Sequence, residues 1–183
     1  MIFVDCEFWT ATQKTWFEGV LEDARTNGYH VVCYIHRPPF IIDQQSAINP
    51  FTGIETTSQS ASRANAEIAA CVQTFINAGG IFAAWFCGHI HQDVSGFGRA
   101  SDGYQTQFAF SIACAGTISA PGYADMARGI GNRTQDCFNL VGIDTNTKTI
   151  KIVRIGANYD RFMRRRNTIS INYATAQIIY ADM

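Results

Sequence analysis

The sequence predicts an α/β fold, in which a β-α-β-α-β first half is followed by antiparallel strands. Two continuous runs of β-branched and aromatic residues, at 30–36 and 81–87, are typical of parallel strands buried on both faces. Segments with helical spacing of apolar residues precede both runs, which favours right-handed crossovers. After residue 105, strand patterns follow one another with no helical pattern between them. We therefore expect one mixed sheet to lead into an antiparallel one.

Size and charge limit the kinds of partner. The chain has 183 residues, enough for one domain spanning 1–183, and a formal net charge of −1. A nearly neutral chain has no electrostatic attraction for nucleic acid or an anionic membrane, so we expect neither as a partner. We interpret the basic cluster at 164–166 as a solvated turn. The longest apolar run is too short to cross a bilayer, and no signal peptide opens the chain.

The cysteines indicate a reducing compartment. There are six, none of them in a C-x-x-C pair, and several stand inside apolar runs where cysteine behaves as a small buried hydrophobe. This spacing does not resemble a disulfide framework. We therefore expect free thiols and a cytoplasmic protein.

The first half divides into a strand at 2–5, a helix, the strand at 30–36, a second helix and the strand at 81–87. In the first helix Trp16, Phe17, Val20, Leu21 and Ala24 recur at helical spacing, with Thr12 as a possible N-cap and Gly28 as the stop. The second helix places Ile68, Val72, Phe75 and Ile76 inward and ends at Gly79 and Gly80. Between these units, 37–60 reads as a long loop.

The second half is expected to be strands and turns. Strands are predicted at 106–116, 137–144 and 149–156, and the turn at 144–149 makes the last two a hairpin. The glycine-rich stretch 116–136 is a loop, and the tail from 168 supplies one or two edge strands.

Three of the four histidines fall at one edge of the predicted sheet. His36 ends one buried strand, and His89 and His91 directly follow the next. Ligands of open α/β sheets bind outside the carboxyl ends of the strands. Residues two apart on an extended backbone point the same way, so His89 and His91 can address one site. Gly88 suits a sharp turn or a close approach to a ligand. His30, in contrast, reads as a strand-start or surface residue.

Imidazole suits manganese, iron, zinc and nickel, so the grouping favours a divalent-metal site made by His36, His89 and His91 over coincidence. The same residues carry a resemblance to a known family. "HRPP" at 36–39 and "GHIH" at 88–91 resemble two motifs of the calcineurin-like metallophosphoesterases, in the family's order. The opening "FVDCEFW", the helix "TQKTWFEGVL" and the C-terminal "LVGIDTNTKTIKIVRIGANYDR" resemble family elements as well.

The resemblance implies a dinuclear metal centre that hydrolyses phosphomonoesters or phosphodiesters. In it, His36 and His89 would ligate one ion and His91 the other. The family fold it implies is an α/β/β/α sandwich, of which this chain resembles only the C-terminal half. The family's D-x-H, G-D and G-N-H motifs do not occur here. No catalytic residue is therefore assigned.

Because these motifs supply the carboxylate ligands of the family's metal centre, this sequence lacks those ligands as well. The nearest acids are Asp5, Glu7, Asp43, Asp93 and Asp102, and we read each as a cap, a turn residue or a solvated acid. Because two cations repel unless an anionic oxygen bridges them, we expect the chain alone to bind at most one ion and to be weakly active or inactive.

Two interpretations stay open. The chain is either a metal-dependent phosphoesterase completed by a further N-terminal part, or a non-catalytic remnant or interaction domain of that family. In both cases we expect a homo-oligomer or a complementing N-terminal fragment to cover exposed apolar strands. Other classes of protein fit poorly. A cupin would have a glutamate a few residues after the H-x-H pair, and this sequence has none there. An amidohydrolase needs a longer barrel, and a nucleotide-binding protein needs a glycine-rich phosphate-binding motif after a strand, which does not occur here.

Overall fold

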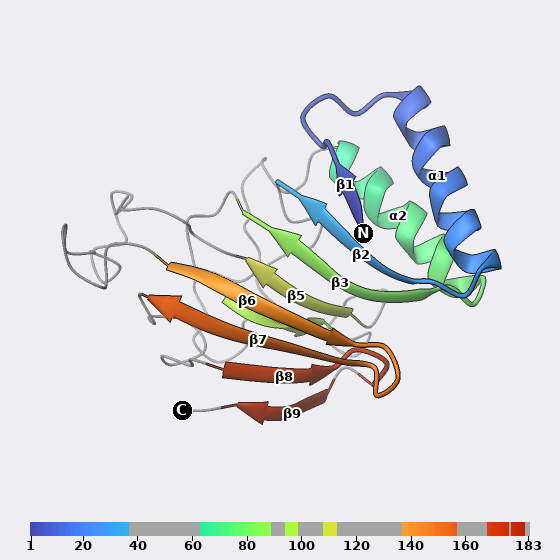
Figure 1. Ribbon diagram of the computed structural model, residues 1–183. Helices are drawn as coiled ribbons and strands as arrows, with labels where there is room; N and C mark the ends of the chain where they lie inside the picture. Colours follow the sequence, from blue (N-terminus) through green and yellow to red (C-terminus); the bar gives the residue numbers. More distant parts are fainter. Residues whose placement is uncertain are drawn as a thin grey trace, which may run out of the picture.

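A computed structural model describes residues 1–36, 63–88, 94–98, 108–112, 137–156, 168–175 and 177–181. The elements in chain order are β1 (Ile2–Val4), α1 (Ala11–Thr26), β2 (His30–Ile35), α2 (Arg63–Asn77), β3 (Ile81–Cys87), β4 (Val94–Gly98), β5 (Phe108–Ile112), β6 (Cys137–Asp144), β7 (Thr149–Gly156), β8 (Thr168–Asn172) and β9 (Gln177–Ala181). The α/β class is confirmed, with a mainly parallel sheet and a separate antiparallel sheet (Figure 1).

The first sheet has the strand order β1-β2-β3-β5-β4. The β-α-β-α-β prediction is confirmed, since β1, β2, β3 and β5 run parallel to one another. Strand β4, which pairs antiparallel with β5, was not predicted. Its sequence, VSGFG, holds two glycines in five residues, so it shows no strand-like run of apolar residues.

The second sheet has the order β6-β7-β8-β9, with every pair antiparallel. The predicted hairpin is confirmed as β6 and β7. The tail supplies two strands, but only β9 lies at an edge, because β8 pairs with β7 on one side and β9 on the other. The predicted loops at 37–60 and 116–136, and the basic cluster at 164–166, lie outside the described residues.

Helix α1 begins earlier than predicted. Thr10, not Thr12, is its N-cap: the Thr10 side chain accepts a hydrogen bond from the Gln13 backbone, and the Gln13 side chain accepts one from the Thr10 backbone. Both threonines precede the apolar pattern, but only Thr10 has a glutamine three residues later, the spacing of a capping box. The predicted stop is confirmed, because Gly28 follows the helix with φ of +68°.

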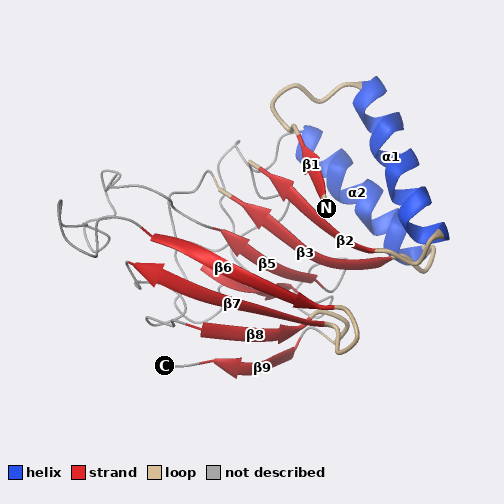
Figure 2. Ribbon diagram, in the orientation of Figure 1, coloured by secondary structure: helices blue, strands red, loops and turns tan. Residues whose placement is uncertain are grey.

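Both helices pack on one face of the first sheet (Figure 2). Phe17 of α1 and Ile68 of α2 have no exposed surface, and they belong to the same buried cluster as Val4, Ile35 and Cys87 from the sheet. We call this cluster the helix-side core. The apolar faces predicted for the two helices therefore supply the helix residues of this core.

The opposite face of the first sheet packs against the second sheet. Val32, Ala83 and Ala84 from β2 and β3 form one buried cluster with residues of the second sheet, namely Ile150, Ile152, Ile169, Ile171 and Tyr173. We call this cluster the intersheet core. Strands β2 and β3 are thus covered on both faces, as their uninterrupted apolar runs predicted.

The cysteine prediction holds for the four cysteines whose side chains the structure describes. Cys6, Cys33, Cys71 and Cys87 are buried free thiols. Burial raises the pKa of Cys33 to about 12 and that of Cys71 to about 11, so both are neutral at pH 7. Within the described ranges, none of the helices has the length and apolarity needed to cross a membrane.

Candidate functional site

His36 stands at the carboxyl edge of the parallel strands. It directly follows β2, its side chain is exposed, and its carbonyl oxygen accepts a hydrogen bond of 3.0 Å from the Gly88 backbone at the end of β3. The prediction that these two strand ends are neighbours is confirmed. The chain therefore enters the His89–His91 segment beside His36, although His89 and His91 themselves lie outside the described residues.

The backbone does not require a glycine at position 88. A Cβ placed there would lie 3.8 Å from His36 Nδ1 and 3.8 Å from the His36 carbonyl oxygen, which is ordinary contact. Among the described glycines only Gly28 and Gly79 have positive φ. Gly88 therefore shows no conformation that only glycine adopts, and both the suggested sharp turn and the suggested approach of a ligand stay predictions.

Asp5 occupies the corresponding position at the end of β1. Its Oδ1 accepts hydrogen bonds from the backbone N–H groups of Glu7, at 2.9 Å, and Phe8, at 3.2 Å. The interpretation of Asp5 as a turn residue is confirmed, because the carboxylate holds the turn that leads toward α1. Asp43, Asp93 and Asp102 lie outside the described residues.

His30 stands at the start of a strand, as predicted, and it also has a structural contact that was not predicted. It begins β2, and its Nδ1 pairs with the hydroxyl of the buried Tyr173, which follows β8. Burial, and then the charge of Lys148, lower the pKa of His30 below its ordinary value of 6.5. The pair ties the two sheets together at the end opposite His36.

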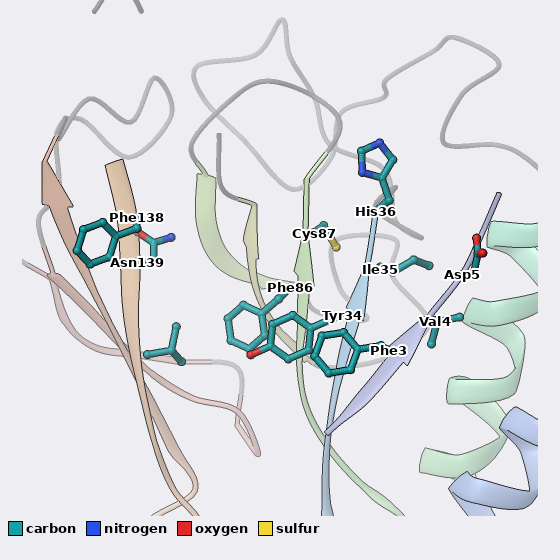
Figure 3. Close-up of a pocket in the computed structure, with 11 residues that line it drawn as sticks. Phe3, Val4, Asp5, Tyr34, Ile35, His36, Phe86, Cys87, Phe138 and Asn139 are labelled. Atoms are coloured by element: carbon teal, nitrogen blue, oxygen red, sulfur yellow. The ribbon is translucent and has the colours of Figure 1, made fainter. Parts of the chain in front are cut away.

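A pocket of about 610 Å³ opens beside His36, between the first sheet and strand β6. One wall comes from β1, β2 and β3, and the other from Phe138, Asn139 and Val141 of β6 (Figure 3). Asp5 and His36 are the polar groups where the first wall reaches the carboxyl edge. This volume lies within the range of about 300–1,000 Å³ that is usual for small-molecule sites.

Three aromatic rings form the first wall. Phe3, Tyr34 and Phe86 are register partners on adjacent strands, so they point to the same face of the sheet. The Phe3 and Tyr34 rings stack with centroids 4.8 Å apart, and the Tyr34 and Phe86 rings with centroids 5.1 Å apart. We call these three rings the aromatic row.

The aromatic row was not predicted, although the sequence carries a signal for it. Each ring lies two residues before a residue of the carboxyl edge, in Phe3-Val4-Asp5, Tyr34-Ile35-His36 and Phe86-Cys87-Gly88. Each of the three parallel strands has an aromatic residue, then an apolar residue, then the residue at the carboxyl edge. Residues at the same place in this order can therefore lie side by side across the sheet. Only the strand order and register, however, show that the rings are neighbours.

Cys87 also lines the pocket but is not a ready metal ligand. Burial, followed by its proximity to Cys33 and Cys6, raises the pKa of its thiol well above the ordinary value. The thiolate is the form that binds metal, so a neutral Cys87 contributes only apolar surface.

The structure describes only part of the predicted set of metal ligands. Within the described ranges, no three His, Cys, Asp or Glu side chains gather closely enough to hold a metal. His36 is the one predicted ligand in the part of the chain that the structure describes. Asp5, an acid at the end of the neighbouring strand β1, accepts two backbone hydrogen bonds of its turn through Oδ1. A dinuclear centre would need an anionic oxygen that bridges the two ions.

Comparison with protein-family models and with curated proteins gives no match to this chain.

Proposed function

We propose that this chain is the C-terminal part of a metal-dependent phosphoesterase of the calcineurin-like type, weakly active or inactive by itself. The observation that carries the proposal is the hydrogen bond between Gly88 and His36. Through it, the strand end bearing His36 and the strand leading into His89 and His91 are neighbours. His89 and His91 follow Gly88 within three residues of the chain, which supports the proposal that the three imidazoles share one site.

The layer order supports the same proposal. Helices cover one face of a mainly parallel sheet, and an antiparallel sheet packs on the other. We interpret this as three layers of the family's α/β/β/α sandwich, with the layer and strands of the N-terminal half absent from this chain.

In the proposed site, His36, His89 and His91 would hold one divalent ion, of manganese, iron, zinc or nickel. A bound ion of this kind polarises a phosphate ester and lowers the pKa of a bound water. The described residues contribute the position of His36, fixed by its backbone bond to Gly88, and a largely apolar pocket beside it.

Metal binding tests the proposal directly. We expect calorimetric titration with Mn²⁺ or Zn²⁺ to give no more than one ion per chain, and His36→Ala to weaken binding at least tenfold. The matched control is His30→Asn, since asparagine keeps an acceptor for the Tyr173 hydroxyl far from the edge. Equal binding by the wild type and His36→Ala would contradict the proposed ligand set.

Activity tests whether the site is complete. We expect little manganese-dependent hydrolysis of an aryl phosphate by the chain alone, and more when a fragment carrying D-x-H, G-D and G-N-H motifs is added. His89→Ala should abolish the added turnover. Full activity of the chain alone, unaffected by His89→Ala, would exclude this site as its origin.

A second candidate is a non-catalytic interaction domain derived from the same family. The supporting observation is the edge strand β6, whose Phe138 and Leu140 are 52 % and 55 % exposed. Residues 137–143 of this strand carry no charge, and charged residues are a usual protection of edge strands. We expect light scattering to show a homo-oligomer, or a heterodimer once the N-terminal fragment is supplied; a monomer in both samples would contradict this.

A further inference from the structure

The pocket has a direction, given by the rows along its first wall. The aromatic row of Phe3, Tyr34 and Phe86 is followed, two residues along the same strands, by Asp5, His36 and Gly88. Strands advance about 3.3 Å per residue, so the two rows are about 7 Å apart. A ligand lying along the wall thus meets apolar rings at one end and polar groups at the other.

The rings present their exposed surface to the pocket. Phe3 is 69 % exposed, whereas its chain neighbours Ile2 and Val4, which point to the helix side, are 7 % and 6 % exposed. Tyr34 and Phe86 are half-buried and pack at the border of the intersheet core. Stacked rings with accessible faces and edges form a surface suited to a flat aromatic group.

The opposite wall is apolar with one amide. Val141 is 37 % exposed, and Asn139 lies two residues before it on the same face of β6, while Phe138 stands at the rim (Figure 3). Among the lining residues that the structure describes there is no lysine, arginine or glutamate, and the one carboxylate, Asp5, lies at the edge. The body of the ligand should therefore be uncharged, with its charge confined to the His36 end.

We propose that the pocket receives the organic group of an aromatic phosphate ester, with its ring on the aromatic row and its phosphate at the His36 edge. This inference rests on the proposed phosphoesterase function and adds the substrate class. A two-ring group such as naphthyl spans the separation of about 7 Å between the rows better than a methyl or short alkyl group does.

Binding without metal separates this inference from the proposed function. The probes are 2-naphthyl phosphate, cyclohexyl phosphate and methyl phosphate, titrated calorimetrically into the full chain in the presence of a chelator. We expect 2-naphthyl phosphate to bind about tenfold more tightly than methyl phosphate, with cyclohexyl phosphate between them.

Variants of the aromatic row locate the binding. Phe3→Ala should weaken 2-naphthyl phosphate binding about five- to tenfold and leave methyl phosphate binding unchanged. Phe8→Ala is the control, because Phe8 is 77 % exposed and does not line the pocket. Tyr34→Leu, which removes the middle ring and keeps apolar volume, provides a second variant that should weaken binding similarly.

Three results would overturn the inference. The first is equal affinity for the three esters, and the second is the same loss from Phe3→Ala and Phe8→Ala. The third is a wild-type dimer, seen by light scattering, that Phe3→Ala dissociates without ligand, since the pocket would then be a protein interface. Metal binding that depends on His36 alongside any of these results would leave the proposed function standing and remove only the substrate class.

Discussion

One histidine stands at each end of strand β2, and the two lie in different surroundings. His30 is in a closed, buried region, whereas His36 is beside an open pocket. His30 begins β2 and pairs with Tyr173, where the two sheets meet in the intersheet core. His36 follows β2 at the other end, where the pocket separates the first sheet from β6. Between them Val32 is buried, and Tyr34 is half-buried.

This comparison shows that burial along one face of a strand depends on what the second sheet places opposite. At the His30 end, Ile150, Ile171 and Tyr173 have 0 to 2 % exposure. At the His36 end, Val141 and Phe138 of β6 stand across a pocket of about 610 Å³. Structural and candidate functional residues therefore share a single strand, with buried packing at one end and a pocket, the candidate binding surface, at the other.

Removing Tyr173 should have the largest effect, because it is among the largest fully buried side chains. We expect Tyr173→Ala to lower the free energy of unfolding by about 3–5 kcal/mol, the usual cost of a large cavity. Denaturant unfolding followed by circular dichroism measures this change. A loss below about 1 kcal/mol would mean that the sheets are not held together at this end.

Removing only the hydroxyl should cost less. Tyr173→Phe keeps the ring and leaves His30 Nδ1 without its partner, so we expect a loss of about 1–2 kcal/mol. The double variant with His30→Ala, which removes the imidazole, should show a non-additive change in the same measurement, because the two residues interact. Strict additivity would show that the pair contributes no coupling.

A pH dependence of stability should follow from His30. Its folded pKa is below 6.5, so the unfolded chain takes up a proton more readily than the folded one as the pH falls. The contribution of neutral His30 is therefore fully present above pH 6.5 and is lost as the pH falls through the folded pKa. The free energy of unfolding should fall more between pH 8 and pH 5 for the wild type than for His30→Asn, as measured by denaturant unfolding at each pH. An equal fall in both proteins would contradict this assignment.

Phe3→Ala should have the smallest effect on stability. With 69 % of the residue exposed, the ring loses little burial on removal, and we expect a change below about 1 kcal/mol. Phe8→Ala, with 77 % exposure, is the matched control in the same unfolding experiment. A loss for Phe3→Ala as large as that for Tyr173→Ala would place the aromatic row in the core and abolish the contrast between the two ends.

Local sequence patterns predicted most of the elements, since each depends on neighbouring residues. The runs at 30–36 and 81–87 correctly indicated strands covered on both faces, and the apolar spacing of α1 and α2 indicated the faces that form the helix-side core. The N-cap of α1 was misplaced by two residues because the capping glutamine was not considered. Strand β4 was missed because its pairing with β5 outweighs its poor local propensity.

The candidate site was predictable only in part. That the ends of β2 and β3 are neighbours followed from the rule for parallel strands, and the bond between Gly88 and His36 confirms it. The aromatic row did not follow, because Phe3, Tyr34 and Phe86 are more than thirty residues apart in pairs along the chain. Their stacking requires the register of three strands.

Residue patterns were enough to predict the class of fold, the order of the elements apart from β4 and the placement of His36 at a strand end, since these depend on periodicity and on short-range steric preferences. Which end of the intersheet space is closed and which is open depends on how the two sheets pack. The reason is that burial depends on residues contributed by a second sheet more than one hundred positions away, such as Tyr173 opposite His30 and Val141 across from Tyr34.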